Sequence, residues 1–151
     1  MKEISSGHRS IVRLPEIRGI YFLASHSSVI YVGKSNDIHR RVVHHLYEGK
    51  KAFDSYSWIE YECSDFELAN LEADWVFAYN PNENKIIPEN SKYISVGSIE
   101  RKYGIKKKLL VELLESSCLK EFRACGVSCY EIDQLKSCLW FQELAAISMQ
   151  E

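Results

Sequence analysis

The sequence predicts an α/β (α+β) fold, in which a small three-stranded sheet flanked by helices is followed by a small, mostly helical unit. Two runs rich in β-branched and aromatic residues, 18–24 and 29–33, are separated by a turn-like stretch and predict a hairpin. A third run, 57–63, alternates apolar and polar residues as a half-buried strand does. Helix-capping residues follow the second and third runs, so we expect the order β-β-α-β-α in the first half of the chain.

A first helix is expected directly after the hairpin. Three residues with short polar side chains are candidate N-caps: Ser35, Asn36 and Asp37. The helix should run to about Tyr47, and Gly49 should stop it.

A second helix is expected over about 66–79, with Ser64 or Asp65 as its N-cap and Glu67 in its first turn. Its apolar residues recur at spacings of three and four and form one stripe: Leu68, Leu71, Trp75 and Ala78. The tripeptide Asn80-Pro81-Asn82 should end this helix.

The chain is predicted to divide at about residue 90. Residues 1–90, which begin with an irregular lead-in over 1–15, hold the predicted sheet. Residues 91–151 form the second unit, and residues 85–97 are expected to connect the two.

The second unit has the pattern of a helix, a turn and a helix. A short helix begins at Ser98, Tyr103-Gly104 breaks it, and a second helix covers 106–115. Residues 119–130 predict a small hairpin or wing. One long final helix is expected over 131–148, with these apolar residues: Ile132, Leu135, Leu139, Trp140 and Leu144.

The composition predicts a folded cytoplasmic protein. Hydrophobic residues make up 46% of the chain, which is enough for a packed core. No apolar run approaches the roughly 18 residues of a membrane helix, so no membrane partner is expected. Five cysteines without a secretory signal predict free thiols rather than a disulfide framework.

Charge is distributed unevenly along the chain, although the formal net charge is only −2. Residues 1–51 are net positive and hold all five histidines, whereas residues 52–87 are net negative. A local basic patch can bind nucleic acid on a mildly acidic protein, so the overall charge does not exclude such a ligand.

Several candidate reactive side chains gather near the predicted hairpin. Arg41 and His45 are four residues apart and therefore share one face of the first helix. Lys34 ends the second strand, and Tyr21 and Tyr31 lie on the two strands. These five side chains could converge near one end of the sheet.

Glu72 is the acidic counterpart of this group. It lies in the middle of the second helix near the apolar stripe, and a buried carboxylate needs a cation beside it. Asn84, in a loop beyond that helix, could brace one of these groups through hydrogen bonds. Phosphodiester hydrolysis uses such a set: a carboxylate for a metal, an arginine for transition-state charge, and a tyrosine or histidine to deprotonate water.

Residues 18–88 resemble the GIY-YIG nuclease family. Gly19-Ile20-Tyr21 matches the first signature, and Tyr31-Val32-Gly33-Lys34 matches the second with valine in place of isoleucine. Arg41 and His45 stand where the family places its arginine and its histidine or tyrosine.

The resemblance extends to Glu72, in a segment similar to the metal-binding glutamate segment of the family, and to Asn84. It implies that Glu72 holds one Mg²⁺ or Mn²⁺ ion and that Asn84 orders the site from behind. No organic cofactor is expected.

The resemblance also implies roles for the other residues. Tyr21 would be the general base, helped by His45 or the metal, and Arg41 would bind the scissile phosphate. Tyr31 and Lys34 would position water and phosphate. The expected reaction is hydrolysis of DNA, most naturally duplex DNA, which leaves 5′-phosphate and 3′-hydroxyl ends.

The second unit resembles, more loosely, the helix-turn-helix of MerR-like or excisionase-like DNA-binding modules. Basic side chains of both units are candidate nucleic-acid contacts: Lys34, Arg40, Arg41, Lys102, Lys106, Lys107, Lys108 and Arg123. The alternative is a helical hairpin with a lysine-rich solvated end. The apolar final helix also raises the possibility of a homodimer.

Ordinary structural roles remain open for the same residues. The strand tyrosines could serve only in packing, Asp37 could form a surface ion pair with Arg41, and Glu72 could be an exposed helix charge. At the level of function, the alternatives are a non-catalytic DNA-binding regulator and a nuclease that acts on RNA. A compact nuclease with an appended DNA-binding unit fits a bacterial, phage or mobile-element enzyme of restriction or homing type.

Overall fold

The computed structural model describes residues 2–4, 16–88 and 91–147. Its first sheet has four antiparallel strands in the order β1-β4-β2-β3. The strands are β1 (Lys2–Ile4), β2 (Gly19–Ser25), β3 (Ser28–Ser35) and β4 (Ser55–Glu60). The three predicted strands are confirmed. The expectation of an irregular lead-in is wrong at 2–4, which pair with β4, and otherwise lies outside the described residues.

The β2–β3 hairpin turns through His26 and Ser27, which both have positive φ angles of 50° and 64°. Two such residues in succession give the twist that a tight antiparallel hairpin needs. The Asp54 carboxylate accepts a hydrogen bond from the His26 backbone N–H at 2.8 Å, which ties the turn to the start of β4. The predicted hairpin is therefore confirmed.

Two capped helices belong to this unit. Helix α1 (Ile38–Glu48) starts at Asp37, whose side chain accepts the Arg40 N–H, and ends at Gly49 with φ of 62°. Helix α2 (Asp65–Tyr79) starts at a capping box between Ser64 and Glu67. Both helices occupy the stretches that the sequence predicts.

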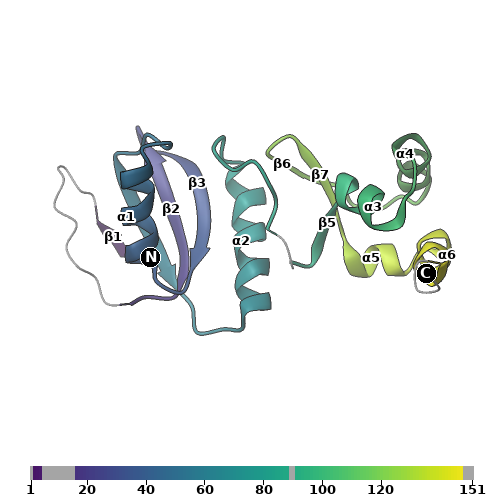
Figure 1. Cartoon of the computed structure of the whole chain (residues 1–151), viewed down its shortest axis with the longest axis horizontal. Coiled ribbons are helices and arrows are strands. Elements are labelled where there is room, and N and C mark those ends of the chain that lie inside the picture. Colours follow the sequence, from purple (N-terminus) through teal and green to yellow (C-terminus); the bar gives the residue numbers. More distant parts are fainter. Residues whose placement is uncertain (1, 5–15, 89–90, 148–151) are drawn as a thin grey trace.

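The helices cover opposite faces of the sheet, because side chains alternate along β2. Tyr21 and Leu23 pack with Ile38 and Val42 of α1 in one core. Residues on the other face of the sheet pack against α2 in a second core, whose buried members are Ile20, Phe22, Val32, Leu68, Val76 and Ala124. Figure 1 shows α2 running beside β3, the edge strand of the sheet.

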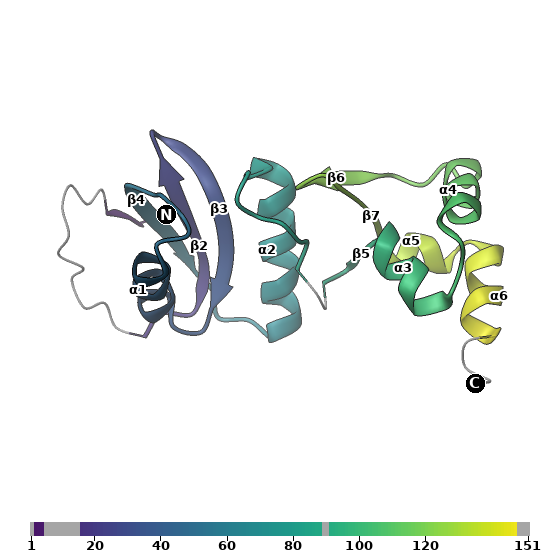
Figure 2. The same ribbon diagram turned by 45° about the horizontal axis from the view of Figure 1, so that its top comes forward.

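The second unit is built on a three-stranded antiparallel sheet in the order β5-β7-β6. Its strands are β5 (Tyr93–Ser95), β6 (Phe122–Ala124) and β7 (Val127–Glu131). Its helices are α3 (Val96–Tyr103), α4 (Lys107–Ser116), α5 (Ile132–Lys136) and α6 (Leu139–Ile147). Figure 2 shows the four helices together at the end of the molecule away from the first sheet.

Helix α2 lies between the two sheets in both views (Figures 1 and 2). Ala73 packs with Tyr93 and Cys129 of the second sheet. The Asp74 carboxylate accepts a 2.7 Å hydrogen bond from the Tyr93 hydroxyl, and Asn70 accepts the Lys92 backbone N–H at 2.6 Å. The predicted apolar stripe is confirmed for Leu68, Leu71 and Trp75, which pack in the core shared with the first sheet, whereas Ala78 is exposed. The second sheet covers a further side of the helix, which the sequence did not predict.

Two other predictions about the second unit need correction. The connector expected over 85–97 includes β5 and the first two residues of α3. The final helix is interrupted at Ser137, whose hydroxyl bonds to the Gln134 carbonyl at 2.6 Å. The break changes the direction of the chain, so Leu139 is 76% exposed and Phe141 is buried instead. The predicted end of that helix, at 148, lies outside the described residues.

Gly19 is required by the packing of β2 against β4. A Cβ atom at this position would overlap the carbonyl oxygen of Ile59 on the paired strand. Because that obstacle is backbone, we expect Gly19→Ala to lower the free energy of unfolding by about 2 kcal/mol or more. Urea denaturation followed by circular dichroism would measure the change.

Gly97→Ala is the matched control for this substitution. Gly97 is a helical residue of α3 with open space around its Cα, so the same change should be neutral or slightly stabilising. Equal destabilisation by both substitutions would contradict the proposed role of the Gly19 contact.

Candidate active site

Tyr21 and His45 form a hydrogen-bonded pair between the sheet and α1. The Tyr21 hydroxyl lies 2.8 Å from Nε2 of His45, and His45 is only 2% exposed. Burial, with the charges of Lys51 and Arg41, lowers the pKa of His45 from 6.5 to about 4. Burial likewise raises the pKa of Tyr21 far above its usual value. At neutral pH the pair therefore consists of a neutral imidazole and a protonated phenol.

Tyr31 completes an aromatic cluster with this pair. Its ring centroid lies 6.0 Å from that of Tyr21 and 5.2 Å from that of His45. The Lys51 ammonium sits 4.5 Å from the centroid of the Tyr31 ring. Lys51 was not among the predicted site residues, and its signal in the sequence is a basic residue shortly after α1.

Gly33 leaves room for both tyrosine rings. A Cβ atom at this position would lie 2.6 Å from the Tyr21 hydroxyl oxygen and 2.8 Å from Cε1 of Tyr31. Real Cβ atoms do not approach other atoms so closely, so any larger residue would displace the Tyr21 hydroxyl. The glycine of the second signature therefore shapes the site directly.

Arg41 stands on the exposed side of α1 within electrostatic reach of Tyr21 and Tyr31. One guanidinium nitrogen, Nη1, lies 3.5 Å from Nδ1 of His44. The suggested Asp37–Arg41 ion pair is absent among the described residues, because Asp37 lies 3.6 Å from Nε of Arg40 instead. Arg41 thus keeps an accessible guanidinium beside the tyrosines.

Glu72 is half-buried on α2, and its Oε1 accepts the Lys34 backbone N–H at 3.2 Å. In the described part of the chain no lysine or arginine side chain lies within ion-pairing distance of this carboxylate. Burial raises the pKa of Glu72 from 4.5 to about 7, although Lys34 and Arg41 oppose the shift. The alternative of a solvated surface charge is therefore wrong for Glu72.

Asn84 holds the edge strand β3 in place. Its Oδ1 accepts the Val32 backbone N–H at 2.9 Å, and its Nδ2 donates to the Val32 carbonyl at 2.8 Å. The Glu83 backbone N–H donates to the Ile30 carbonyl at 2.9 Å. The side-chain amide therefore continues the sheet ladder in place of a further strand and fixes the backbone between Tyr31 and Gly33.

The two parts of the site meet around the edge of β3. The Tyr21–His45 pair lies on the α1 face of the sheet, and Glu72 approaches from α2 on the other face. The electrostatic influence of Arg41 reaches Glu72, and that of Glu72 reaches Tyr31. A phosphate at this edge would therefore face the arginine, the tyrosines and the carboxylate together.

The predicted nucleic-acid contacts of the second unit are not part of this cluster. Their side chains are exposed on that unit: Lys102, Lys106, Lys107, Lys108 and Arg123. Arg123 forms a 2.9 Å ion pair with Glu121. Arg40, on α1, is also exposed, and its Nε lies 3.6 Å from the Asp37 carboxylate.

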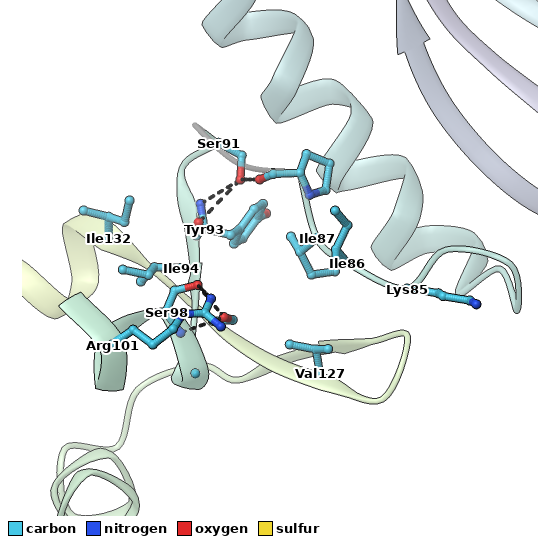
Figure 3. A pocket seen from close by; sticks show the side chains of 13 residues that line it. Lys85, Ile86, Ile87, Ser91, Tyr93, Ile94, Ser98, Arg101, Val127 and Ile132 are labelled. Atoms are coloured by element: carbon cyan, nitrogen blue, oxygen red, sulfur yellow. Dashed lines mark hydrogen bonds between the residues drawn. The ribbon is translucent and has the colours of Figure 1, made fainter. Parts of the chain in front are cut away.

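A cavity of about 570 Å³ lies between the loop 85–88 and the second unit (Figure 3). Apolar side chains from both sides line it, and Arg101 at its margin donates a 3.3 Å hydrogen bond to the Ser98 hydroxyl. The lining contains none of the candidate catalytic residues, so this cavity does not belong to the cluster around β3.

The Glu72 carboxylate fits a magnesium ion better than a metal held by several protein ligands. The described residues contain no group of three or more His, Cys, Asp or Glu placed to hold a metal ion. Magnesium usually keeps several waters and is held by one or two carboxylates together with substrate phosphates. Glu72, half-buried and unpaired with any cation in the ranges that the structure describes, meets that requirement.

Glu72→Gln is expected to stabilise the protein in alkaline buffer that contains EDTA. The pKa of Glu72 is raised by folding, so folding takes up a proton, and the native state loses stability as the pH rises from 4.5 to about 7. Glutamine removes this cost, so the free energy of unfolding should rise by up to about 3 kcal/mol at pH 8. It also keeps an acceptor for the Lys34 N–H. The gain should vanish below about pH 4.5.

Thermal unfolding at pH 4.5 and pH 8 would measure this difference. Glu60→Gln, which changes an exposed glutamate at the end of β4, serves as the control and should shift the melting temperature little at either pH. A Glu72→Gln protein that is less stable than the wild type at pH 8 would contradict the burial cost.

No helix in the described ranges is long and apolar enough to span a membrane. No family model matches the chain. UvrABC system protein C from Mycoplasma pneumoniae is 33% identical to it over 75 residues, which cover 44% of this chain. The chain spans only 12% of the length of that relative.

One solved structure is also similar to the chain. It is the crystal structure of the GIY-YIG N-terminal endonuclease domain of UvrC from Thermotoga maritima, bound to magnesium as its catalytic divalent cation. The identity is 25%, the match covers 49% of this chain and 90% of that domain, and the TM-score is 0.42. Both similar proteins are UvrC proteins, and the predicted resemblance to the GIY-YIG family is confirmed at the level of sequence.

Proposed function

We propose that the chain is a metal-dependent endonuclease that hydrolyses DNA phosphodiester bonds at the edge of β3. One observation carries the proposal: Glu72, a half-buried carboxylate that pairs with no cation among the described residues, lies across this edge from the hydrogen-bonded Tyr21–His45 pair and from Arg41. Packing alone does not require a buried polar pair, an accessible arginine and a half-buried acid to converge at one strand edge.

Glu72 would hold the divalent ion, with Mg²⁺ as the natural choice for a single carboxylate and Mn²⁺ as a substitute. When bound, the ion would neutralise charge on the phosphate. The Lys34 N–H fixes one carboxylate oxygen at 3.2 Å and thereby orients the other.

The Tyr21–His45 pair would remove the proton of the attacking water. A phenol with a raised pKa does not lose its proton alone, so the Tyr21 oxygen would take the water proton while its own proton passes to Nε2 of His45. This assignment places the His45 proton on Nδ1, which lies 3.8 Å from the Glu48 carboxylate. Tyr21 would thus act as the general base through His45.

Arg41 would bind the scissile phosphate and stabilise its transition state. Its guanidinium is exposed on α1 beside the tyrosines, where a substrate can reach it. Tyr31 would position the water, with Lys51 over its ring, and Lys34 would contact the phosphate. Asn84 would act by positioning, because it holds the strand that carries Tyr31.

The second unit would select the DNA to be cut. Helices α3 and α4 are joined by the short turn 104–106. The turn of the β6–β7 hairpin contacts the end of α2 instead, where the Cys125 backbone N–H donates to the Asn80 side chain. The exposed lysines 106–108 lie at the start of α4. Backbone N–H groups and basic side chains at the start of a helix commonly bind phosphates. Tethering this unit to the site would raise the local concentration of substrate.

The test is digestion of a mixed pool of duplex DNA with Mg²⁺, followed by sequencing of the ends. We expect cuts that leave 5′-phosphate and 3′-hydroxyl ends, and no cuts in EDTA. RNA and single-stranded DNA digested in parallel would decide the substrate class. Selective DNA binding without cleavage under any metal would instead favour the non-catalytic regulator.

A dimer would allow both strands to be cut in one encounter. The exposed Leu139 and Ile147 of α6 could form such a contact. Light scattering in the presence of DNA tests it, and a monomer under those conditions would count against it.

A further inference from the structure

A second cavity adjoins the site described above. It has a volume of about 570 Å³ and lies between the end of β3 and the first turn of α2. Its lining includes Lys34, whose backbone N–H is bonded to Glu72, so the cavity and the proposed catalytic edge share a residue. A nucleic-acid strand with a phosphate at Glu72 would therefore come close to this cavity on the Lys34 side.

Phe66 lines the cavity and is 57% exposed. The capping box of Ser64 and Glu67 fixes the turn of α2 that carries it, so the ring projects from a rigid base. Phe66 and Glu72 are six residues apart on one helix, or about 9 Å along its axis. That separation corresponds to a few nucleotides of a bound strand.

The remaining lining of the cavity is polar apart from Leu68. Lys34, Ser35 and Asn36 come from the end of β3 and the turn after it. Among the described lining residues Asp65 supplies the negative charge, and Arg18 binds it at 2.8 Å while also donating to Asn36. An exposed aromatic face beside a lysine, in a groove whose acid is already paired, suits a nucleotide: the ring meets a base and the cation meets the backbone.

We infer that Phe66 stacks on the base of a nucleotide close to the scissile phosphate, and that this base must be unpaired to reach it. The inference rests on the proposed nuclease function and adds a substrate preference to it. DNA with an unpaired or unstacked nucleotide near the cleavage point is the preferred substrate, because stacking on a protein side chain requires the base to leave its own stack.

The experiment measures binding without cleavage, in EDTA, by fluorescence anisotropy. A duplex with one unpaired nucleotide should bind more tightly than the fully paired duplex. Phe66→Ala should weaken binding of the first duplex by roughly 5- to 150-fold, as expected for the loss of one stacked base. Phe66→Trp should preserve the affinity, because it keeps a ring.

An abasic substrate sharpens the test. Removing the unpaired base from the DNA should weaken binding of the wild-type protein as much as the Phe66→Ala substitution does. The same removal should not weaken binding of the Phe66→Ala protein any further. Tyr47→Ala removes another exposed aromatic ring from the same unit and should leave both affinities unchanged. Phe66 forms no buried core, so its variants should fold normally.

The outcomes separate the two proposals. Phe66-dependent binding without any cleavage in Mg²⁺ would support the stacking role and contradict the nuclease. Cleavage with equal affinities of wild type and Phe66→Ala for the unpaired substrate would overturn the stacking role and leave the nuclease standing. Failure of the wild-type protein to bind either duplex would overturn the stacking role as well.

Discussion

Replacing Glu72 with glutamine is expected to reduce DNA cleavage by about 1,000-fold or more, while DNA binding is retained. A metal on a carboxylate contributes several kcal/mol to the transition state, and each 1.4 kcal/mol is about a factor of ten in rate. Glutamine keeps the acceptor for the Lys34 N–H at 3.2 Å, so the local fold should survive. Plasmid nicking in Mg²⁺ and anisotropy in EDTA would measure the two properties.

A metal titration would distinguish loss of the ion from loss of geometry. Mg²⁺ should raise the melting temperature of the wild type at pH 8 and should not raise that of Glu72→Gln. If the Glu72→Gln protein cleaved DNA at the wild-type rate, that result would contradict the assignment of Glu72 as the metal ligand. The substitution should therefore raise stability and lower cleavage. This combination is expected when a carboxylate is buried at a cost in stability because its charge is needed for function.

Replacing Tyr21 with phenylalanine is expected to lower the cleavage rate by roughly 100- to 10,000-fold. The substitution removes only the hydroxyl that lies 2.8 Å from His45 and keeps the ring in its core. It leaves His45 without this buried partner, so a small loss of stability should accompany the loss of activity. Single-turnover cleavage and circular dichroism would measure both.

Tyr56→Phe is the matched control, because Tyr56 is a strand tyrosine in the same core and stacks on Trp58. Its cleavage rate should stay within a factor of a few of the wild type. Unchanged cleavage by Tyr21→Phe would mean that Tyr21 serves only in packing, as the sequence alone allowed.

Local sequence signals were enough to predict the hairpin, β4 and both helices of the first unit, but not β1, whose pairing with β4 joins distant segments. Positive-φ turns, side-chain caps and alternation act between neighbouring residues, so the hairpin and the ends of α1 and α2 follow from short stretches. The prediction of one long final helix was wrong because it used the same local signals. The apolar spacing continues through Ser137, and the break becomes evident only from the packing, which buries Phe141 and leaves Leu139 exposed.

The sequence by itself determined which chemistry is available: two tyrosines, a lysine, an arginine, a histidine and a helical glutamate in a fixed order. Only the tertiary structure decided how they work together. It buried the Tyr21–His45 pair, gave Glu72 no ion-paired cation in the described part of the chain, placed Lys51 over Tyr31 and exposed Phe66 beside Lys34. Those properties depend on which faces the second sheet and the two helices cover, and burial between distant segments cannot be read from neighbouring residues.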